Sequence, residues 1–221
     1  MLFRSENDFK QTLREYRGLF LFIVLMVMFR SAVADWNDVP SESMKPTILV
    51  GDRIFVNKLA YSVRVPLTHV SLYRFAEPER GDIVVFDSDA ADMRLVKRVI
   101  GLPGDTVAMV DERLVINGVP ARYETVREEG SSLFVKETVS GAEHVLLIDQ
   151  SRPAINGSFG PVVVPEGHYL VLGDNRRNSA DSRFYGFVPR DELVGRAGSV
   201  VVSLDPDNYF LPRTDRFVDP L

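Results

Sequence analysis

An unbroken apolar run near the N-terminus is the feature that most limits how this chain can fold. Residues 18–29 read G-L-F-L-F-I-V-L-M-V-M-F, without a single polar side chain. Twelve helical residues span about 18 Å, less than the roughly 30 Å of a bilayer's hydrocarbon core. Extending the helix through Arg30 to Ala34 brings its length to about 25 Å, and the long Arg30 side chain can reach the interface from there. We therefore predict a single transmembrane anchor over residues 18–35.

The residues on either side of this run predict its orientation. The N-terminal tail, residues 1–17, carries four basic side chains: Arg4, Lys10, Arg14 and Arg17. Basic residues favour the cytoplasmic side, and Trp36 follows the run at the depth where membrane proteins favour aromatic rings. The tail is therefore expected in the cytoplasm, and everything after Trp36 outside it.

Two other interpretations of the run stay open. Ala32-Val33-Ala34 fits the A-x-A pattern of a cleaved secretory signal peptide, although a charge at Arg30, just before such a site, is unusual. The run is also compatible with a buried helix of a soluble protein. The anchor and the cleaved signal both export the remainder of the chain.

Composition excludes several kinds of chemistry. The 221 residues include no cysteine, which rules out disulfides, thiolate zinc sites and a cysteine nucleophile. The three histidines, His69, His144 and His168, lack metal-ligand spacing, so we predict no metal and no cofactor. With 26 basic and 31 acidic residues the net charge is −5, which disfavours nucleic acid as the main partner. Any hydrolytic chemistry is expected to run without metal, cysteine or histidine.

From about Pro40 onward the pattern is mainly β. Short apolar runs occur at residues 53–56, 82–86, 95–100, 114–116 and 169–172. Asn117-Gly118 between two such runs predicts a two-residue hairpin. We expect coiled antiparallel sheets or a partly closed β-barrel-like core. The core is assigned to residues 36–104 and 162–221, and the more polar residues 105–161 to a small inserted β subdomain.

Two segments carry candidate chemical groups. Ser41 and Ser43 lie two residues apart in P-S-E-S-M-K-P-T, residues 40–47, either in an ordinary loop or as an oxyanion donor beside a nucleophile. Lys97 has Leu95 and Val99 as its neighbours on one strand face, while Arg94, Val96, Arg98 and Ile100 point to the other. Burial among apolar side chains would lower the lysine pKa and allow it to take a proton from a serine hydroxyl. A lysine extending from a strand edge into solvent is the simpler alternative.

A third segment, G-D-N-R-R-N-S-A-D-S-R at residues 173–183, follows an apolar strand. Eleven residues so rich in polar and turn-forming types need many internal hydrogen bonds. Such a loop is more specific in composition than a solvated turn usually is.

Five ordered motifs together resemble one family. They are S-E-S-M-K-P-T, G-D-R-I-F-V-N-K-L-A-Y (51–61), R-G-D-I-V-V-F (80–86), V-K-R-V-I-G-L-P-G-D and G-D-N-R-R-N-S-A-D-S-R. In this order, after an apolar segment, they resemble bacterial type I signal peptidases of peptidase family S26. These are serine proteases of the bacterial cytoplasmic (inner) membrane that remove signal peptides from exported preproteins.

The resemblance implies roles for the residues at the matching positions. Ser43 would be the nucleophile and Lys97 the general base. The Ser41 hydroxyl and the Ser43 backbone N–H would form the oxyanion hole, and Ser179 would orient the lysine amine. Asp181 and Arg183 would be a supporting polar pair. Arg177 departs from the family pattern, which usually has an acidic residue there, so the ion pairs of this loop are in doubt.

The resemblance also implies the substrate and partners. Family substrates carry small residues, typically alanine, at positions −1 and −3 from the cut, and the candidate pocket lining is Val39, Met44, Ile48, Leu95 and Val96. The partners would be signal peptides and the lipid bilayer, which the apolar cluster Tyr209-Phe210-Leu211 could also contact. The sequence does not indicate an oligomeric state.

Three alternatives remain at this point. A specialised relative would mature one dedicated conjugation or pilus substrate. A self-cleaving Ser–Lys repressor would need a scissile Ala-Gly before the nucleophile, whereas Ala197-Gly198 comes after the lysine. A non-catalytic membrane-anchored β scaffold would require the serine and lysine to be inert.

Overall fold

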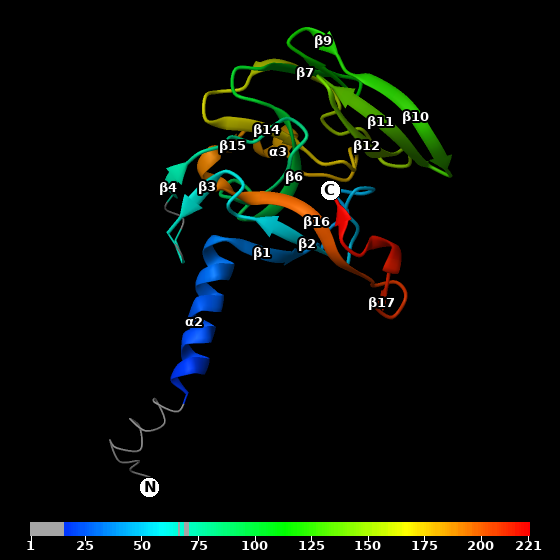
Figure 1. Cartoon of the computed structure of the whole chain (residues 1–221). Helices are drawn as coiled ribbons and strands as arrows, with labels where there is room; N and C mark the ends of the chain where they lie inside the picture. Colours follow the sequence, from blue (N-terminus) through cyan, green and yellow to red (C-terminus); the bar gives the residue numbers. More distant parts are fainter. Residues whose placement is uncertain (1–15, 66, 69–70) are drawn as a thin grey trace.

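The computed structural model describes residues 16–65, 67–68 and 71–221. The basic residues Arg4, Lys10 and Arg14 of the predicted cytoplasmic tail, and His69, lie outside this part of the chain. The first described element, α2, projects away from a body made almost entirely of strands (Figure 1).

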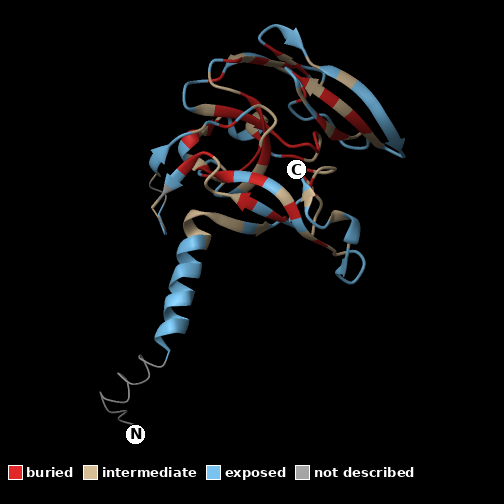
Figure 2. Cartoon of the chain, in the orientation of Figure 1, coloured by how far each residue is buried: buried red, intermediate tan, exposed pale blue. Residues whose placement is uncertain are grey.

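The apolar run forms α2 (Arg17–Ala32), whose side chains are largely exposed (Figure 2). The expected extension of this helix to Ala34 is wrong, because Ala34 begins β1 (Ala34–Asp38) and pairs with Asn57. Its backbone hydrogen bonds therefore go to the sheet. Within the described ranges, no helix is both long and apolar enough to cross a membrane.

The end of α2 is held directly against the sheet. The Lys58 Nζ donates to the carbonyl oxygen of Arg30 at 2.8 Å, and the Arg30 guanidinium pairs with Asp35 at 2.6 Å. The same guanidinium lies 4.6 Å from the centroid of the Trp36 ring. Arg30, which we expected to extend toward a membrane interface, thus contacts the first strand.

The largest sheet is antiparallel and has nine strands, of which seven follow the order β1-β2-β16-β5-β6-β14-β15 and two pair with β16. Its other strands are β2 (Asp52–Asn57), β16 (Leu193–Asp205), β5 (Ile83–Ser88), β6 (Met93–Gly101), β14 (His168–Leu172), β15 (Val188–Pro189), β17 (Leu211–Pro212) and β18 (Asp219–Pro220). The predicted strands at 53–56, 82–86, 95–100 and 169–172 are confirmed.

This sheet does not close on itself, so the partly closed barrel is not found in the described structure. Its terminal strands β1 and β15 each have a partner on one side only in the sheet order. The long strand β16 changes partner from β5 to β2 across several bulges. β14 pairs with β6 only from Leu170 to Leu172 and then leaves the sheet as the 173–183 loop. This early departure leaves the residues of β6 before Arg98 without a described strand partner on the β14 side.

Two smaller sheets come from one continuous segment. One has the order β13-β7-β8-β9, and the other has the order β10-β11-β12. Their strands are β7 (Thr106–Val110), β8 (Arg113–Ile116), β9 (Val119–Pro120), β10 (Arg122–Glu129), β11 (Ser132–Val139), β12 (Ala142–Asp149) and β13 (Phe159–Val163). The predicted two-residue turn at Asn117-Gly118 is confirmed by the pairing of Ile116 with Val119.

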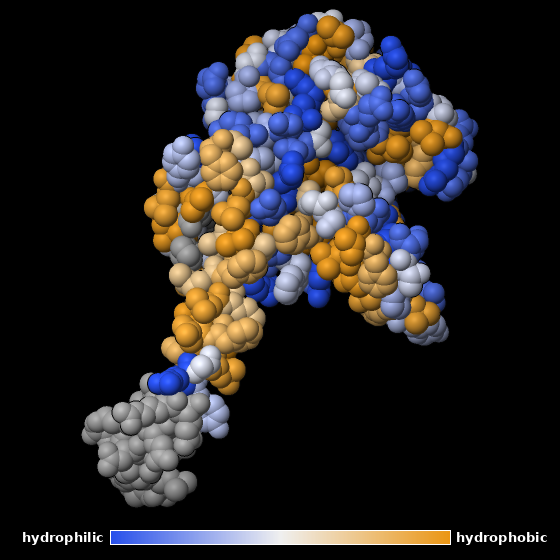
Figure 3. Space-filling view, viewed as in Figure 1, coloured by the Kyte–Doolittle hydropathy of each residue, from blue (hydrophilic) through white to orange (hydrophobic). Residues whose placement is uncertain are grey.

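Short elements complete the chain: β3 (Ser62–Arg64) and β4 (Ser71–Arg74), α3 (Ser182–Tyr185), and the 3₁₀ turns η1 (Arg190–Glu192) and η2 (Thr214–Arg216). The β3–β4 hairpin carries exposed apolar side chains, among them Val63, Leu72 and Tyr73. In Figure 3, hydrophobic residues continue from α2 onto the adjoining face of the body.

The core has three apolar clusters, and one of them joins the insert to the large sheet. It contains Val107, Leu114 and Ile116 of the small sheet together with Ile100 of β6 and Leu170 of β14. Residues 105–161 therefore have strands of their own but share a core with the rest. Their assignment to a separate subdomain stays a prediction; we refer to them below as the insert.

Candidate active site

The Ser41–Ser43 segment lies in the turn between β1 and β2. Backbone hydrogen bonds from Lys45 N to Glu42 O and from Ile48 N to Met44 O, both 3.0 Å, give the turn its shape. Met44 and Ile48 are almost completely buried beneath it. Burying these two side chains fixes the turn to the sheet, with Ser43 itself buried at 9% exposure and Ser41 more exposed.

Lys97 lies in β6 opposite Val84 of β5, and only 2% of it is exposed. Its Nζ donates to the Ser43 Oγ at 2.7 Å and to the Val96 carbonyl oxygen at 2.9 Å. The solvent-exposed alternative for this lysine is therefore wrong. Because the strand alternates, Leu95 and Val99 pack in one apolar cluster and Val96 packs against another, as expected.

Burial has a direct effect on the protonation of this lysine. Desolvation lowers the pKa of Lys97 from 10.5 to about 8, and the charge of Arg183 acts in the same direction. The carboxylates of Asp181 and Asp174 oppose the change by favouring the ammonium form. The balance leaves an amine that can be neutral at mildly alkaline pH and that already touches a hydroxyl oxygen.

Ser41 brings a second hydroxyl to the same place. Its Oγ lies 3.2 Å from the Ser43 Oγ, and either group can donate the hydrogen bond. The pairing places a hydroxyl next to the Ser43 Oγ, close to where the oxygen of a carbonyl group attacked by Ser43 would develop negative charge, as an oxyanion donor requires.

The 173–183 loop packs directly on the Ser43 turn. The Asn175 backbone N–H donates to the Ser43 carbonyl oxygen at 3.0 Å. Gly173 permits this approach, because a Cβ there would lie 2.5 Å from the same carbonyl oxygen and 2.2 Å from the Ser179 Oγ. Three segments distant in sequence therefore meet at one buried point: the turn after β1, the middle of β6 and the loop after β14.

Asp181 organises this loop. It is 1% exposed, and its carboxylate accepts from the Gly173 N–H at 2.9 Å, the Ser179 hydroxyl at 2.8 Å and the Arg183 Nε at 2.8 Å. Burial alone would raise the pKa of Asp181, but Arg183 and these hydrogen bonds hold it below its usual range. Asp181 is therefore a buried, fully satisfied anion beside Lys97.

The position of Ser179 differs in detail from its expected role. Its hydroxyl donates to Asp181, while the described partners of the Lys97 Nζ are the Ser43 Oγ and the Val96 carbonyl. The described hydrogen bond of Ser179 is therefore to Asp181, whose charge raises the pKa of Lys97, and not to Lys97 itself. Direct orientation of the amine by Ser179 stays a prediction.

Sequence reasoning missed a second buried ion pair next to the site. The Arg98 guanidinium forms two hydrogen bonds to Asp174, at 2.9 and 2.7 Å, and Thr47 donates to the same carboxylate at 2.6 Å. Burial would raise the pKa of Asp174, but the charge of Arg98 lowers it below its usual range. The only signal was a second basic residue directly after Lys97 in β6, which did not indicate a partner 76 residues away.

The candidate pocket residues divide between two faces of β6. Val39, Met44, Ile48 and Val96 pack in one apolar cluster. Leu95 packs on the other side, where it lines a small cavity with Asp181. The structure thus brings four of the five together, and their use as a substrate pocket stays a prediction.

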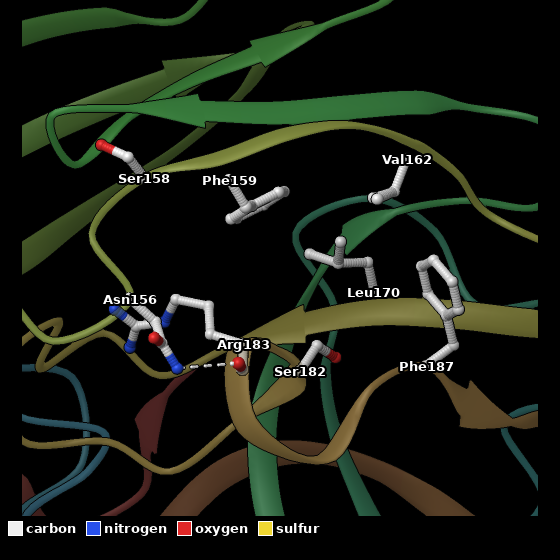
Figure 4. A pocket seen from close by; sticks show the side chains of 8 residues that line it. All are labelled: Asn156, Ser158, Phe159, Val162, Leu170, Ser182, Arg183 and Phe187. Carbon is white, nitrogen blue, oxygen red and sulfur yellow. Dashed lines mark hydrogen bonds between the residues drawn. The ribbon is translucent and has the colours of Figure 1, made fainter.

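A larger cavity of about 290 Å³ lies between part of the insert and the end of the 173–183 loop (Figure 4). Its lining is Asn156, Ser158, Phe159, Val162, Leu170, Ser182, Arg183 and Phe187. At one end the Asn156 amide donates to the Arg183 carbonyl oxygen at 3.0 Å, as the dashed line in Figure 4 marks. Of the predicted site residues only Arg183 borders it, and its guanidinium is already paired with Asp181.

The described residues contain no group of three or more histidines and carboxylates arranged to hold a metal ion. The polar groups at the centre of the site are the exposed Ser41, the buried Ser43 and Lys97, and two buried aspartates that are each paired with an arginine. This arrangement can supply a nucleophilic hydroxyl, a proton acceptor and an oxyanion donor.

Comparison with known proteins agrees with this geometry. The family described as signal peptidase, peptidase S26, matches residues 13–202 of the chain. The chain belongs to this family. It is therefore a serine peptidase, and the inert β scaffold is no longer a viable alternative.

Relatives of this S26 peptidase are found in distant bacteria. A protein named signal peptidase I from Pseudomonas aeruginosa is 39% identical over 213 residues, covering 89% of this chain and 74% of the relative. The protein of the same name from Bacillus licheniformis is 38% identical over 193 residues, covering 87% and 89%. A crystal structure of a signal peptidase I from Enterococcus faecalis V583 is 34% identical and covers 55% of this chain and 97% of that one, with a TM-score of 0.36.

The repressor alternative also conflicts with the position of its candidate cleavage site. Ala197-Gly198 lies within β16, where Ala197 is buried and pairs with Val56 of β2. A peptide bond in the middle of a paired central strand is not available to a nucleophile elsewhere in this S26 peptidase.

Proposed function

We propose that this chain is a membrane-anchored endopeptidase that removes N-terminal signal peptides from exported preproteins, with Ser43 as nucleophile and Lys97 as general base. The observation that carries the proposal is the 2.7 Å hydrogen bond between the Lys97 Nζ and the Ser43 Oγ at a site where the lysine is 2% exposed. The relatives named signal peptidase I support the substrate class.

The proposed reaction begins with the neutral Lys97 amine. As the Ser43 Oγ attacks the carbonyl carbon at the cleavage site, its proton passes to the Nζ. The Ser43 backbone N–H and the Ser41 hydroxyl stabilise the resulting oxyanion. The Lys97 ammonium then gives the proton to the leaving amine, and the signal peptide remains as an ester on Ser43. Lys97 next takes a proton from water, which hydrolyses the ester and restores the free serine.

The proposed location is the bacterial cytoplasmic membrane, with a single anchor, the N-terminus in the cytoplasm and the catalytic residues outside. Its support is the apolar and exposed surface of α2, with the exposed Trp36 in the strand that follows the helix. The exposed side chains of Tyr209, Phe210 and Leu211 offer a second apolar contact with the bilayer.

The deciding experiment compares point variants in the cleavage of a preprotein that has alanine at positions −1 and −3. Purified full-length protein in detergent is assayed by the appearance of the mature product. Ser43→Ala and Lys97→Ala should each lower the rate by roughly 10⁴-fold or more, because the two residues act as one unit. Ser41→Ala should lose roughly 10²–10³-fold, the usual cost of one oxyanion donor.

Two results would contradict the proposal. Substantial cleavage by Lys97→Ala at neutral pH would show that another group accepts the serine proton. No cleavage of any signal-peptide substrate by the wild-type protein, with the fold intact by circular dichroism, would remove the substrate class.

A further inference from the structure

The insert holds the 173–183 loop through two adjacent arginines. Arg176 pairs with Glu137 of β11, and Arg177 pairs with Glu112 in the turn between β7 and β8. We infer that Glu112 is a positioning residue of this peptidase, whose ion pair with Arg177 fixes the loop that holds the Ser43 turn. The inference rests on the proposed function for its activity readout, and it assigns a role in the reaction to the insert.

The Glu112–Arg177 contact has the geometry of a specific pair. The Arg177 Nε lies 2.9 and 3.1 Å from the two Glu112 carboxylate oxygens, and its Nη2 donates to Oε2 at 2.6 Å. A further N–H, on Nη1, donates to the Arg152 carbonyl oxygen at 2.9 Å. Both charged side chains are mostly buried, at 19% and 13% exposure. A bidentate, partly desolvated pair of this kind fixes orientation as well as distance.

A short series of contacts leads from this pair to the nucleophile. Asn178, the next residue, accepts from the Arg152 guanidinium at 3.0 Å and donates to the Glu42 carboxylate at 3.1 Å. On the other side of Arg177, the Asn175 side chain donates to the Glu42 carbonyl at 3.2 Å and its backbone to the Ser43 carbonyl at 3.0 Å. Arg177 therefore lies between the two residues that hold Glu42 and Ser43.

The backbone of the β7–β8 turn gives independent support. Val110 pairs with Arg113, so Asp111 and Glu112 form a two-residue turn with φ values of 48° and 64°. Both residues adopt the left-handed conformation that favours glycine. The neighbouring turn of the same sheet places Gly118 at the equivalent second position, with φ 78°. A glutamate at a position whose backbone conformation favours glycine suggests that its side chain has a role, and the described partner of that side chain is Arg177.

The test is Glu112→Gly, which relaxes the turn and removes the ion pair together. If Glu112 only stabilised the fold, activity and thermal stability would fall together. If it positions the loop, we expect kcat to fall about 10–100-fold, the cost of a small misplacement of reacting groups, with KM changed less than about 3-fold. The Tm should stay within a few degrees of wild type. Glu143→Gln, which breaks the exposed Lys136–Glu143 pair of the same insert, is the matched control and should leave kcat unchanged.

A charge exchange checks that the pair itself is responsible. Arg177→Glu alone places two carboxylates together and should lower kcat at least as much as Glu112→Gly. The double variant Glu112→Arg/Arg177→Glu should recover a large part of the lost kcat. Absence of any recovery, or a wild-type kcat in Glu112→Gly, would overturn the inference.

A measurement that does not require substrate separates this inference from the proposed function. Amide hydrogen exchange at residues 174–179 should be faster in Glu112→Gly than in wild type and unchanged in Glu143→Gln. If the wild-type protein cleaves no preprotein, the proposed function fails, and the exchange rates still decide whether Glu112 fixes the loop. Equal protection in wild type and Glu112→Gly would overturn it whatever the activity.

Discussion

Lys97 illustrates how one side chain acquires its chemistry from its surroundings. Its side chain is buried, which lowers its pKa, and two aspartates nearby limit how far that pKa falls. A pKa of about 8 is lower than that of a free lysine, yet the ammonium form still predominates at neutral pH. The neutral form, which accepts the serine proton in the proposed mechanism, is therefore a minor species near pH 7.

The pH dependence of cleavage follows from this balance. Because only the neutral amine can accept the proton, kcat/KM should rise with pH through a midpoint of about 8 and then level off. Asp181→Asn removes a charge that raises the pKa of Lys97, so any residual activity should have its midpoint at lower pH. Initial rates between pH 6 and 10 would measure both. A midpoint near that of free lysine, or movement to higher pH in Asp181→Asn, would contradict this account.

Among the elements, the 173–183 loop carries the tightest packing around the site. Where a side chain of residue 173 would begin lie side-chain atoms of Ser179, from the same loop, and the backbone oxygen of Ser43, from the turn after β1. A methyl group there must displace both Ser179 and the Ser43 turn, and the Ser43 contact is with backbone, which cannot rotate away.

We therefore expect Gly173→Ala to lower cleavage by about 10²-fold or more, because it separates the loop from the nucleophile turn. It should also lower the free energy of unfolding by about 1–3 kcal/mol, as overpacking does. Gly160→Ala is the control, since a Cβ at Gly160 meets no atom within 4 Å. Rate assays and urea unfolding of both variants provide the measurements. Equal activity in the two variants would show that the loop can move without consequence.

Sequence patterns predicted the strands well and the long-range contacts poorly. The period-two alternation around Lys97 correctly separated Leu95 and Val99 from Val96, because strand geometry fixes which side chains share a face. The two-residue turn at Asn117-Gly118 was also predicted correctly. The end of α2 was predicted wrongly, because the pairing of Ala34 with Asn57 depends on a strand that comes later in the chain.

The candidate site was predictable in its residues and not in its supporting contacts. Ser41, Ser43 and Lys97 were found through motifs in a fixed order, and the structure places them in contact. The partners of Arg98 and Arg177 were not found, because opposite charges are common on any chain and their pairing is decided by tertiary structure. The prediction of a partly closed barrel was wrong, because tertiary structure also decides which strands pair at the ends of a sheet.

Across the whole molecule, the buried Glu137–Arg176 pair joins the insert to the site. The two side chains are 0% and 1% exposed, and the charge of Arg176 with a contact from His144 holds the pKa of Glu137 far below its usual range, against the effect of burial. β12 contributes to the same junction, where Leu147 N donates to Asp174 O and Arg176 N to Leu147 O.

Breaking this pair should destabilise the entire fold. Glu137→Gln leaves the Arg176 charge buried without an anion, which typically costs about 3–5 kcal/mol. Because the insert and the large sheet share an apolar cluster, unfolding should remain a single transition at a lower urea midpoint. Glu129→Gln, which breaks the exposed Arg127–Glu129 pair, should leave the midpoint unchanged. Two separate transitions would instead show that the insert unfolds on its own.

Only Val33 separates the end of α2 from the first residue of β1, and Lys58 fastens that junction. The junction therefore contains no flexible linker between the helix and the sheet. If α2 is anchored in lipid as proposed, this short junction would hold Ser43 at one height above the bilayer surface. The distance of a substrate peptide bond from the membrane, together with the residues around that bond, would then decide whether the bond is cut.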